Sequence, residues 1–149
     1  MSTYAVRLGR SSLERGVLLD TSAIFGALDE DDQWHQRAAR GFHLLSQEQR
    51  PLYVTSITIA ETHGLIVSRL DDLIGLAWLD NLTGMNVEHH LPDDHRQVLE
   101  VLRRNMGRAY SYGDAFSFLV MQRVGIHLAY TFDRHFQEYG WEIFPGPLP

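Results

Sequence analysis

The sequence predicts an α/β fold in which a central parallel sheet of about five strands lies between two layers of helices. Short apolar runs rich in branched and aromatic residues alternate with longer helical patterns along the chain. Strands that alternate with helices in this way form parallel sheets covered on both faces. The 149 residues, 44% of them hydrophobic, are enough for one core, so we expect a single domain over residues 1–149.

The first half of the chain contains two predicted strands and three predicted helices. Residues 1–16 are polar, contain arginine and lack an apolar signal region, so we interpret them as an N-terminal arm. Acidic residues 31 and 32 favour a helix start, and Ser56 is a suitable N-cap. The predicted elements are a strand at 17–19, a short helix at 21–30, a helix from 31 to about 47, a strand at 52–55 and a helix from 57 to about 70.

The second half contains three further predicted strands. The segment LIGLAWLDNL at 73–82 is so apolar that we expect its helix to be mostly buried. The tail PGPLP, residues 145–149, cannot continue regular structure. The predicted elements are a helix from 71 to about 84, a weak strand at 85–89, a helix from about 92, a helix from 113 to about 125, and strands at 126–132 and 141–144.

Composition excludes several classes of protein. The chain has no cysteine, which excludes disulfides, cysteine-ligated zinc and thiol catalysis and fits a reducing cytoplasm. It has no run of about 18 apolar residues, so no membrane span is expected. All 13 basic residues are arginine, and without lysine there is no P-loop. The net charge of −6 is unusual for a nucleic-acid binder, and a carboxylate cluster would account for part of it.

Four acidic residues lie where predicted strands end or predicted helices begin. Asp20 and Asp133 follow apolar runs, in VLLDTSAI and AYTFDRHF, whereas Glu61 and Asp114 begin helical patterns. In a parallel α/β sheet, the carboxyl ends of the strands and the starts of the following helices meet at one edge. Four carboxylates gathered there repel one another unless they are protonated or bind a cation. Oxygen ligands suit a hard ion, so the pattern predicts a Mg²⁺ or Mn²⁺ site.

Each acid also has a local structural interpretation. Asp20 is a favoured N-cap residue, and Thr58 and Glu61 have the spacing of a capping box. Asp114 would complement a helix dipole, and Asp133 would suit a turn before a short helix. The occurrence of all four acids in one pattern favours the shared metal site.

These motifs resemble those of PIN-domain ribonucleases, and most of all the toxin of VapBC-type toxin–antitoxin pairs. No single motif is distinctive, but the four occur in the family's order, over roughly residues 17–144. They are Asp20-Thr21-Ser22 after the first strand, Ser56 to Glu61 at a helix start, Gly113-Asp114-Ala115 at another, and Thr131-Phe132-Asp133 after a later strand.

The resemblance implies a three-layer α/β/α PIN-like domain with a metal-dependent endoribonuclease activity. Three of the acids would hold the principal Mg²⁺ or Mn²⁺ ion, and Asp133 would hold a second ion or its water. Ser22 and Thr131 would orient a carboxylate or a metal-bound water, or would equally be satisfied turn hydroxyls. The implied catalytic metal ligands are Asp20, Glu61, Asp114 and Asp133.

Single-stranded or looped RNA is the implied substrate, and Arg134 is a candidate phosphate contact. We interpret His135 as a surface histidine and His35 as structural. The family also implies a small cognate antitoxin, which we expect to bind in an apolar groove, and a homodimer. From the composition we expect no membrane attachment and a cytoplasmic location.

Three alternatives stay open at this point. A free-standing PIN nuclease of RNA processing would lack an adjacent gene for a small DNA-binding partner. A catalytically silent PIN fold used as a binding module would fail a metal titration. A small phosphatase on a similar sheet would act on phosphomonoesters but not on RNA, although Ser22 replaces the second aspartate of the D-x-D motif common in such enzymes.

Overall fold

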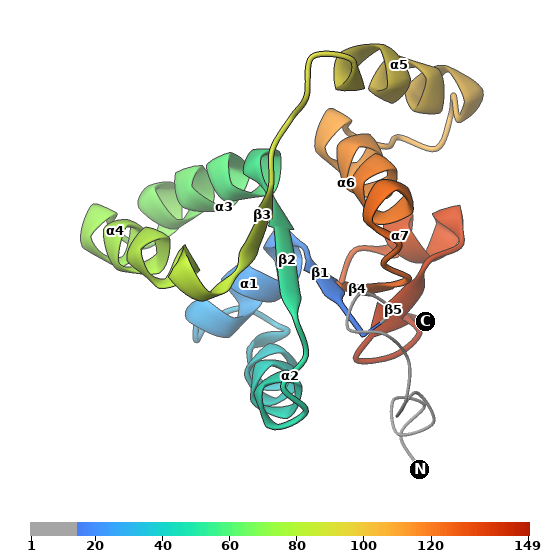
Figure 1. The fold of residues 1–149 in the computed structure, drawn as a ribbon. Coiled ribbons are helices and arrows are strands. Elements are labelled where there is room, and N and C mark those ends of the chain that lie inside the picture. Colours follow the sequence, from blue (N-terminus) through green and yellow to red (C-terminus); the bar gives the residue numbers. More distant parts are fainter. Residues whose placement is uncertain (1–14) are drawn as a thin grey trace.

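A parallel sheet of five strands, in the order β3-β2-β1-β4-β5, forms the centre of the computed structural model, which describes residues 15–149 (Figure 1). Every neighbouring pair of strands is parallel, so the predicted sheet is confirmed. β1 and β4 are neighbours although they come from opposite ends of the chain, which brings the residues that follow them together. The strands are β1 (Val17–Leu19), β2 (Leu52–Thr55), β3 (Asn86–Glu88), β4 (Leu128–Tyr130) and β5 (Glu142–Phe144).

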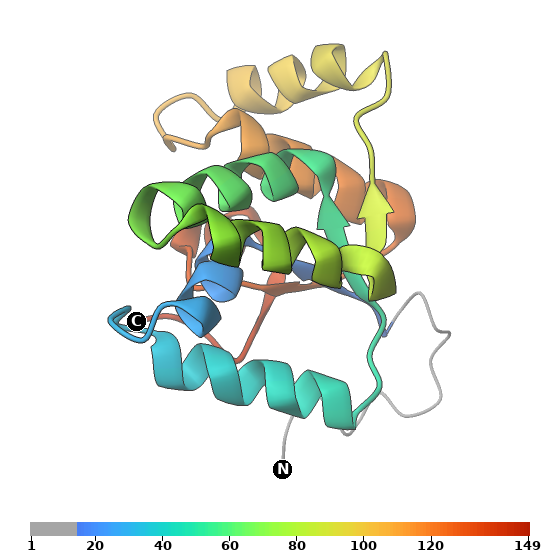
Figure 2. The same cartoon turned by 90° about the vertical axis from the view of Figure 1, so that its left-hand side faces the viewer.

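Helices flank this sheet on both sides (Figures 1 and 2). α1 to α4 lie on one side and α6 lies on the other, with α7 beside it and α5 at one end. The three-layer α/β/α fold is therefore confirmed. The helices are α1 (Thr21–Leu28), α2 (His35–Gln47), α3 (Ser56–Arg69), α4 (Asp72–Asp80), α5 (Asp94–Arg104), α6 (Tyr112–Val124) and α7 (Arg134–Tyr139), and the short 3₁₀ helix η2 (Asn81–Gly84) follows α4.

Tyr130 of β4 joins the sheet to α2. Its buried hydroxyl donates a hydrogen bond to the Ala38 carbonyl, and its ring packs against Phe144 and Phe42. α2 approaches this closely because of Gly41, where a Cβ would lie 2.7 Å from Tyr130 Cζ and 2.9 Å from Phe144 Cε1. A side chain at this position would push α2 off the sheet.

Local side-chain hydrogen bonds explain where the helices begin. α2 starts at His35 rather than at residue 31, because Asp29 and Asp32 accept from the backbone N–H groups two residues onward and form turns. The predicted N-cap at Ser56 is also wrong. Thr55 caps α3 instead, and its Oγ1 accepts from Thr58 N at 3.0 Å.

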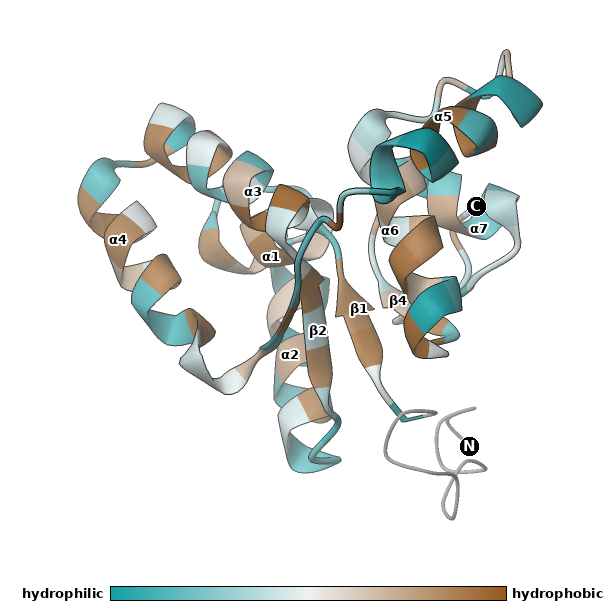
Figure 3. Ribbon diagram, turned by 45° about the horizontal axis from the view of Figure 1, so that its top comes forward, coloured by the Kyte–Doolittle hydropathy of each residue, from teal (hydrophilic) through white to brown (hydrophobic). Residues whose placement is uncertain are grey.

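The expected burial of the helix at 73–82 is wrong. Gly75 and Trp78 of α4 are buried, but Leu73 is 75% exposed and Leu76 is 58% exposed. α4 packs closely on α3 along one face, where a Cβ at Gly75 would lie 3.1 Å from Val67 Cγ2. Figure 3 shows apolar segments along α4 at the outer edge of this helix pair. A high apolar content indicates that a helix packs against another element, but it does not show that both faces of the helix are covered.

The two ends of the described chain are held by polar contacts. Most of the predicted N-terminal arm, residues 1–14, lies outside the described residues, but the Arg15 guanidinium donates to the Glu48 carbonyl at 2.7 Å. The tail lacks regular structure, as expected. Its Leu148 is buried, and Leu148 N donates to Gln137 Oε1 at 2.8 Å. Within residues 15–149, no helix is long and apolar enough to cross a membrane.

Candidate active site

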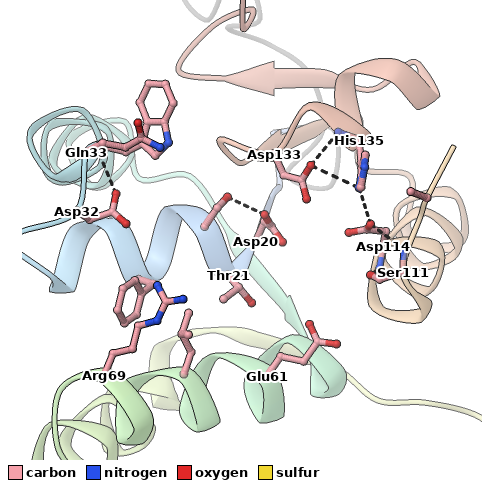
Figure 4. A pocket seen from close by; sticks show the side chains of 15 residues that line it. Asp20, Thr21, Asp32, Gln33, Glu61, Arg69, Ser111, Asp114, Asp133 and His135 are labelled. Carbon is pink, nitrogen blue, oxygen red and sulfur yellow. Dashed lines mark hydrogen bonds and ion pairs between the residues drawn. The ribbon is translucent and has the colours of Figure 1, made fainter.

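One open pocket of about 510 Å³ contains all four predicted acids (Figure 4). It lies where β1 and β4 end, and α1, α3, α6 and α7 supply its walls. The parallel topology therefore gathers side chains from distant parts of the chain, as the sequence predicted. The lining residues are Asp20, Thr21, Ser22, Phe25, Asp32, Gln33, Trp34, Glu61, Leu65, Arg69, Ala109, Ser111, Asp114, Asp133 and His135.

Asp20 lies at the end of β1 and is held by two hydroxyls. Its Oδ2 accepts from Ser22 Oγ at 2.7 Å and from Thr131 Oγ1 at 2.8 Å. Asp20 occupies the N-cap position of α1, but its side chain makes no capping hydrogen bond, so capping does not account for this carboxylate. Burial raises the pKa of Asp20, the two hydroxyl bonds oppose the rise, and the charges of Asp133 and Asp114 add to it. The carboxylate is thus fixed in position but costly to ionise without a counter-charge.

Thr131 also connects Asp20 to Asp133. Its Oγ1 accepts from Asp133 N at 2.8 Å while it donates to Asp20, and Ser22 Oγ accepts from Phe132 N at 2.9 Å. Both hydroxyls therefore bind a carboxylate and a turn backbone at the same time. Each hydroxyl thus orients a carboxylate and also accepts a hydrogen bond from a turn, so the two roles considered from the sequence occur together.

Glu61 projects from α3 against the first turn of α6. A Cβ at Gly113 would lie only 2.8 Å from Glu61 Oε1 and 3.1 Å from Oε2, so a glycine is needed for this approach. The capping role at the start of α3 belongs to Thr55, and the Glu61 carboxylate has no hydrogen bond or ion pair with any residue in 15–149. Burial raises the pKa of Glu61, and the charges of Asp20 and Asp114 raise it further.

Asp114 and Asp133 are joined by His135. Asp114 Oδ2 accepts from Ser111 N at 3.0 Å, as part of a capping box for α6, and lies 2.8 Å from His135 Nδ1. Asp133 Oδ1 accepts from His135 N at 2.9 Å, which caps α7, and lies 3.5 Å from His135 Nδ1. Both acids thus have the helix-start roles considered above and also face the pocket.

The interpretation of His135 as a surface histidine is wrong. Its side chain is 28% exposed and its ring packs edge-on against Tyr110 at 5.2 Å. Partial burial lowers the pKa of His135, but the hydrogen bond to Asp114 and the charges of Asp133, Asp114 and Glu138 outweigh it, so the net change is upward. His35 is structural, as expected, since its Nδ1 lies 2.9 Å from the Gly26 carbonyl oxygen.

The donor set fits a divalent cation. Each of the three aspartates has one oxygen held by hydrogen bonds and a second oxygen with no partner among the described residues. The carboxylate oxygens of Asp114 and Asp133 and a ring nitrogen of His135 lie within 4.8 Å of one another, the one such group in residues 15–149. Asp20 and Glu61 line the same pocket outside that group. Oriented oxygens with unused lone pairs are what a hard cation requires.

The pocket contains a different arginine from the expected one. Arg134 is exposed and does not line the pocket, whereas Arg69, at the end of α3, does. The sequence signal for Arg69 was its spacing, because it lies eight residues after Glu61 on the same helix.

Comparison with known proteins identifies the family. The sequence model of the PIN-domain family matches residues 17–142, and the chain therefore belongs to the PIN-domain family. It is 33% identical over 133 residues to the 23S rRNA-specific endonuclease VapC20 of Mycobacterium tuberculosis, a match that covers 87% of this chain and 98% of that protein. The resemblance to VapC-type PIN ribonucleases is confirmed.

Two solved structures share this fold. The crystal structure of M. tuberculosis VapC20, a sarcin–ricin loop cleaving toxin, matches with a TM-score of 0.74 and 30% identity, over 84% of this chain and 95% of that one. PAE2754 from Pyrobaculum aerophilum matches with a TM-score of 0.56 and 20% identity, over 91% of this chain and 85% of that one. The second match supports the fold alone.

Proposed function

We propose that this protein is a metal-dependent endoribonuclease, the toxin of a toxin–antitoxin pair, and that it cuts 23S rRNA in the sarcin–ricin loop. The observation that carries the proposal is the gathering of Asp20, Glu61, Asp114 and Asp133 on one pocket. The 33% identity to VapC20, which has this specificity, supports the choice of RNA.

The four acids are the proposed ligands of Mg²⁺ or Mn²⁺. When bound, such an ion supplies an activated water and positive charge for hydrolysis of a phosphodiester. Ser22 and Thr131 hold one oxygen of Asp20 so that the other faces the pocket. His135 does the same for Asp114. Because the bare carboxylates repel RNA phosphates, we expect productive RNA binding to require the ion.

An antitoxin and a second copy of the chain are the proposed protein partners, by analogy with the VapC type. Leu73 and Leu76 on α4, with Val67 on α3, are exposed apolar residues on adjacent helices and offer a surface for one of these contacts. The proposed location is the cytoplasm, where ribosomal RNA is found. Light scattering at micromolar concentration tests the dimer, and a strictly monomeric protein would contradict it.

Mapping of cleavage sites tests the proposed activity. The purified protein is incubated with bacterial ribosomes and with protein-free 23S rRNA in Mg²⁺ or Mn²⁺, and new 5′ ends are located by primer extension. We expect one cut in the sarcin–ricin loop that is absent with EDTA and with Asp20→Asn. A cut elsewhere in RNA would overturn the target but keep the nuclease. Failure to cut any RNA would favour a silent binding module.

A further inference from the structure

One face of α3 follows the pocket along most of its length. Glu61, Leu65 and Arg69 are spaced four residues apart, and all three line the pocket. Residues with this spacing lie on the same side of a helix. At a rise of 1.5 Å per residue, Glu61 and Arg69 are separated by roughly 12 Å along the helix axis. The helix therefore places a carboxylate in the acidic part of the pocket and a guanidinium at its far side.

The guanidinium of Arg69 carries an unpaired charge at the side of the pocket away from Asp114 and Asp133. Its guanidinium carbon lies 5.7 Å from the centre of the Phe25 ring, and the guanidinium makes no hydrogen bond or ion pair with any residue between 15 and 149. Figure 4 shows Arg69 on the opposite side of the pocket from Asp114 and His135. It is the one arginine among the described residues that line the pocket, and the chain has no lysine. Its N–H donors are therefore available to an anion in the pocket.

We propose that Arg69 binds a phosphate of the RNA backbone near the scissile phosphate but distinct from it. This rests on the proposed endoribonuclease function and adds a substrate subsite to it. The separation along α3 favours contact with a phosphate other than the one on which the acids act. Contact with Phe25 restrains the guanidinium before RNA arrives, so that less side-chain entropy is lost on binding. A guanidinium also matches a phosphate through two parallel hydrogen bonds. The α3 face thus sets how far along the strand the cut occurs.

Binding of RNA by variants tests the subsite without relying on cleavage. The probes are a fluorescent hairpin that carries the sarcin–ricin loop and a fluorescent 12-nucleotide single strand. Their anisotropy is measured with the protein in Ca²⁺ over a series of salt concentrations, and a gel shows that the probes stay intact. Arg69→Ala is compared with Arg40→Ala, which removes the same charge from an exposed position on α2 outside the pocket. Arg69→Lys keeps the charge, and melting curves confirm that each variant folds.

We expect Arg69→Ala to raise the Kd about tenfold, the loss of one charge-assisted contact. For this variant, the slope of the logarithm of the binding constant against the logarithm of salt concentration should be smaller in magnitude than for the wild type by about 0.7. That is the value for one phosphate contact on a single strand. Arg40→Ala should stay within about twofold of the wild type, and Arg69→Lys should lie between them. If Arg69→Ala matches Arg40→Ala in both Kd and salt dependence, or if the wild type binds neither RNA, the subsite is overturned. A wild-type protein that binds these RNAs but does not cut them in Mn²⁺ would instead count against the proposed function.

Discussion

Gly113→Ala provides a test of the site that is separate from the stability of the fold. The added Cβ would lie 2.8 Å from Glu61 Oε1, whereas ordinary contacts begin at 3.4 Å, so the oxygen must move by about 0.6 Å. The obstacle is the end of a flexible side chain, and alanine is favoured over glycine in a helix by about 0.5–1 kcal/mol. We therefore expect the melting temperature to stay constant or to rise.

The same shift should damage the cation site. Distances between a metal and its ligands hold within about 0.2 Å, so a displacement of about 0.6 Å removes Glu61 from a common site. We expect Mn²⁺ affinity, measured by calorimetry, to fall about tenfold or more, and RNA cleavage to fall with it. Gly64→Ala on α3 is the matched control, since beyond its own stretch of helix no described atom lies within 4 Å of the added Cβ. Unchanged Mn²⁺ affinity in Gly113→Ala would refute the placement of Glu61 at the site.

The remaining predictions concern the charges around the pocket. Asp20 and Glu61 have raised pKa values, so above pH of about 4 the folded metal-free protein binds more protons than the unfolded chain. The pKa of His135 is also raised. Its contribution to the free energy of unfolding is therefore fully present below about pH 6.5 and is lost as the pH rises. Melting temperature in EDTA should therefore fall between about pH 5 and 8, and Mn²⁺ should reduce the slope; a rise in EDTA would contradict this. Asp20→Asn should abolish cleavage and raise the melting temperature in EDTA, and wild-type cleavage by the variant would remove Asp20 from the site. His135→Asn, which can still donate to Asp114, should keep more Mn²⁺ affinity than His135→Leu, and equal affinities would show that the hydrogen bond is unimportant.

The sheet and the four acids could be predicted because both depend on local patterns. Val17–Leu19 and Leu52–Thr55 are short apolar runs between turn signals, and they form strands β1 and β2 at the expected residues. Asp20 and Asp133 directly follow strands, so their shared edge follows from parallel topology. The strand order was not predictable, since it depends on which non-local pairings bury the most surface.

The features that sequence reasoning missed depend on contacts between distant segments. His135 differs from a surface histidine mainly through Asp114, 21 residues earlier, and Tyr110, 25 residues earlier. The need for glycine at position 113 comes from Glu61 on another helix. The exposure of Leu73 and Leu76 depends on which face of α4 meets α3. In contrast, the spacing of Glu61, Leu65 and Arg69 is visible in the sequence and would have indicated a shared helix face.

The rate of RNA cleavage against free Mn²⁺ tests the central claim most directly. The wild type and Asp20→Asn are assayed on the sarcin–ricin hairpin, beginning in EDTA and adding Mn²⁺ stepwise. If the acidic pocket holds the cation that supports hydrolysis, the wild type should be inactive in EDTA and its rate should rise to a plateau, while Asp20→Asn should show no saturable response. Equal cleavage by the wild type with and without EDTA, or the same Mn²⁺ response from both proteins, would contradict the account.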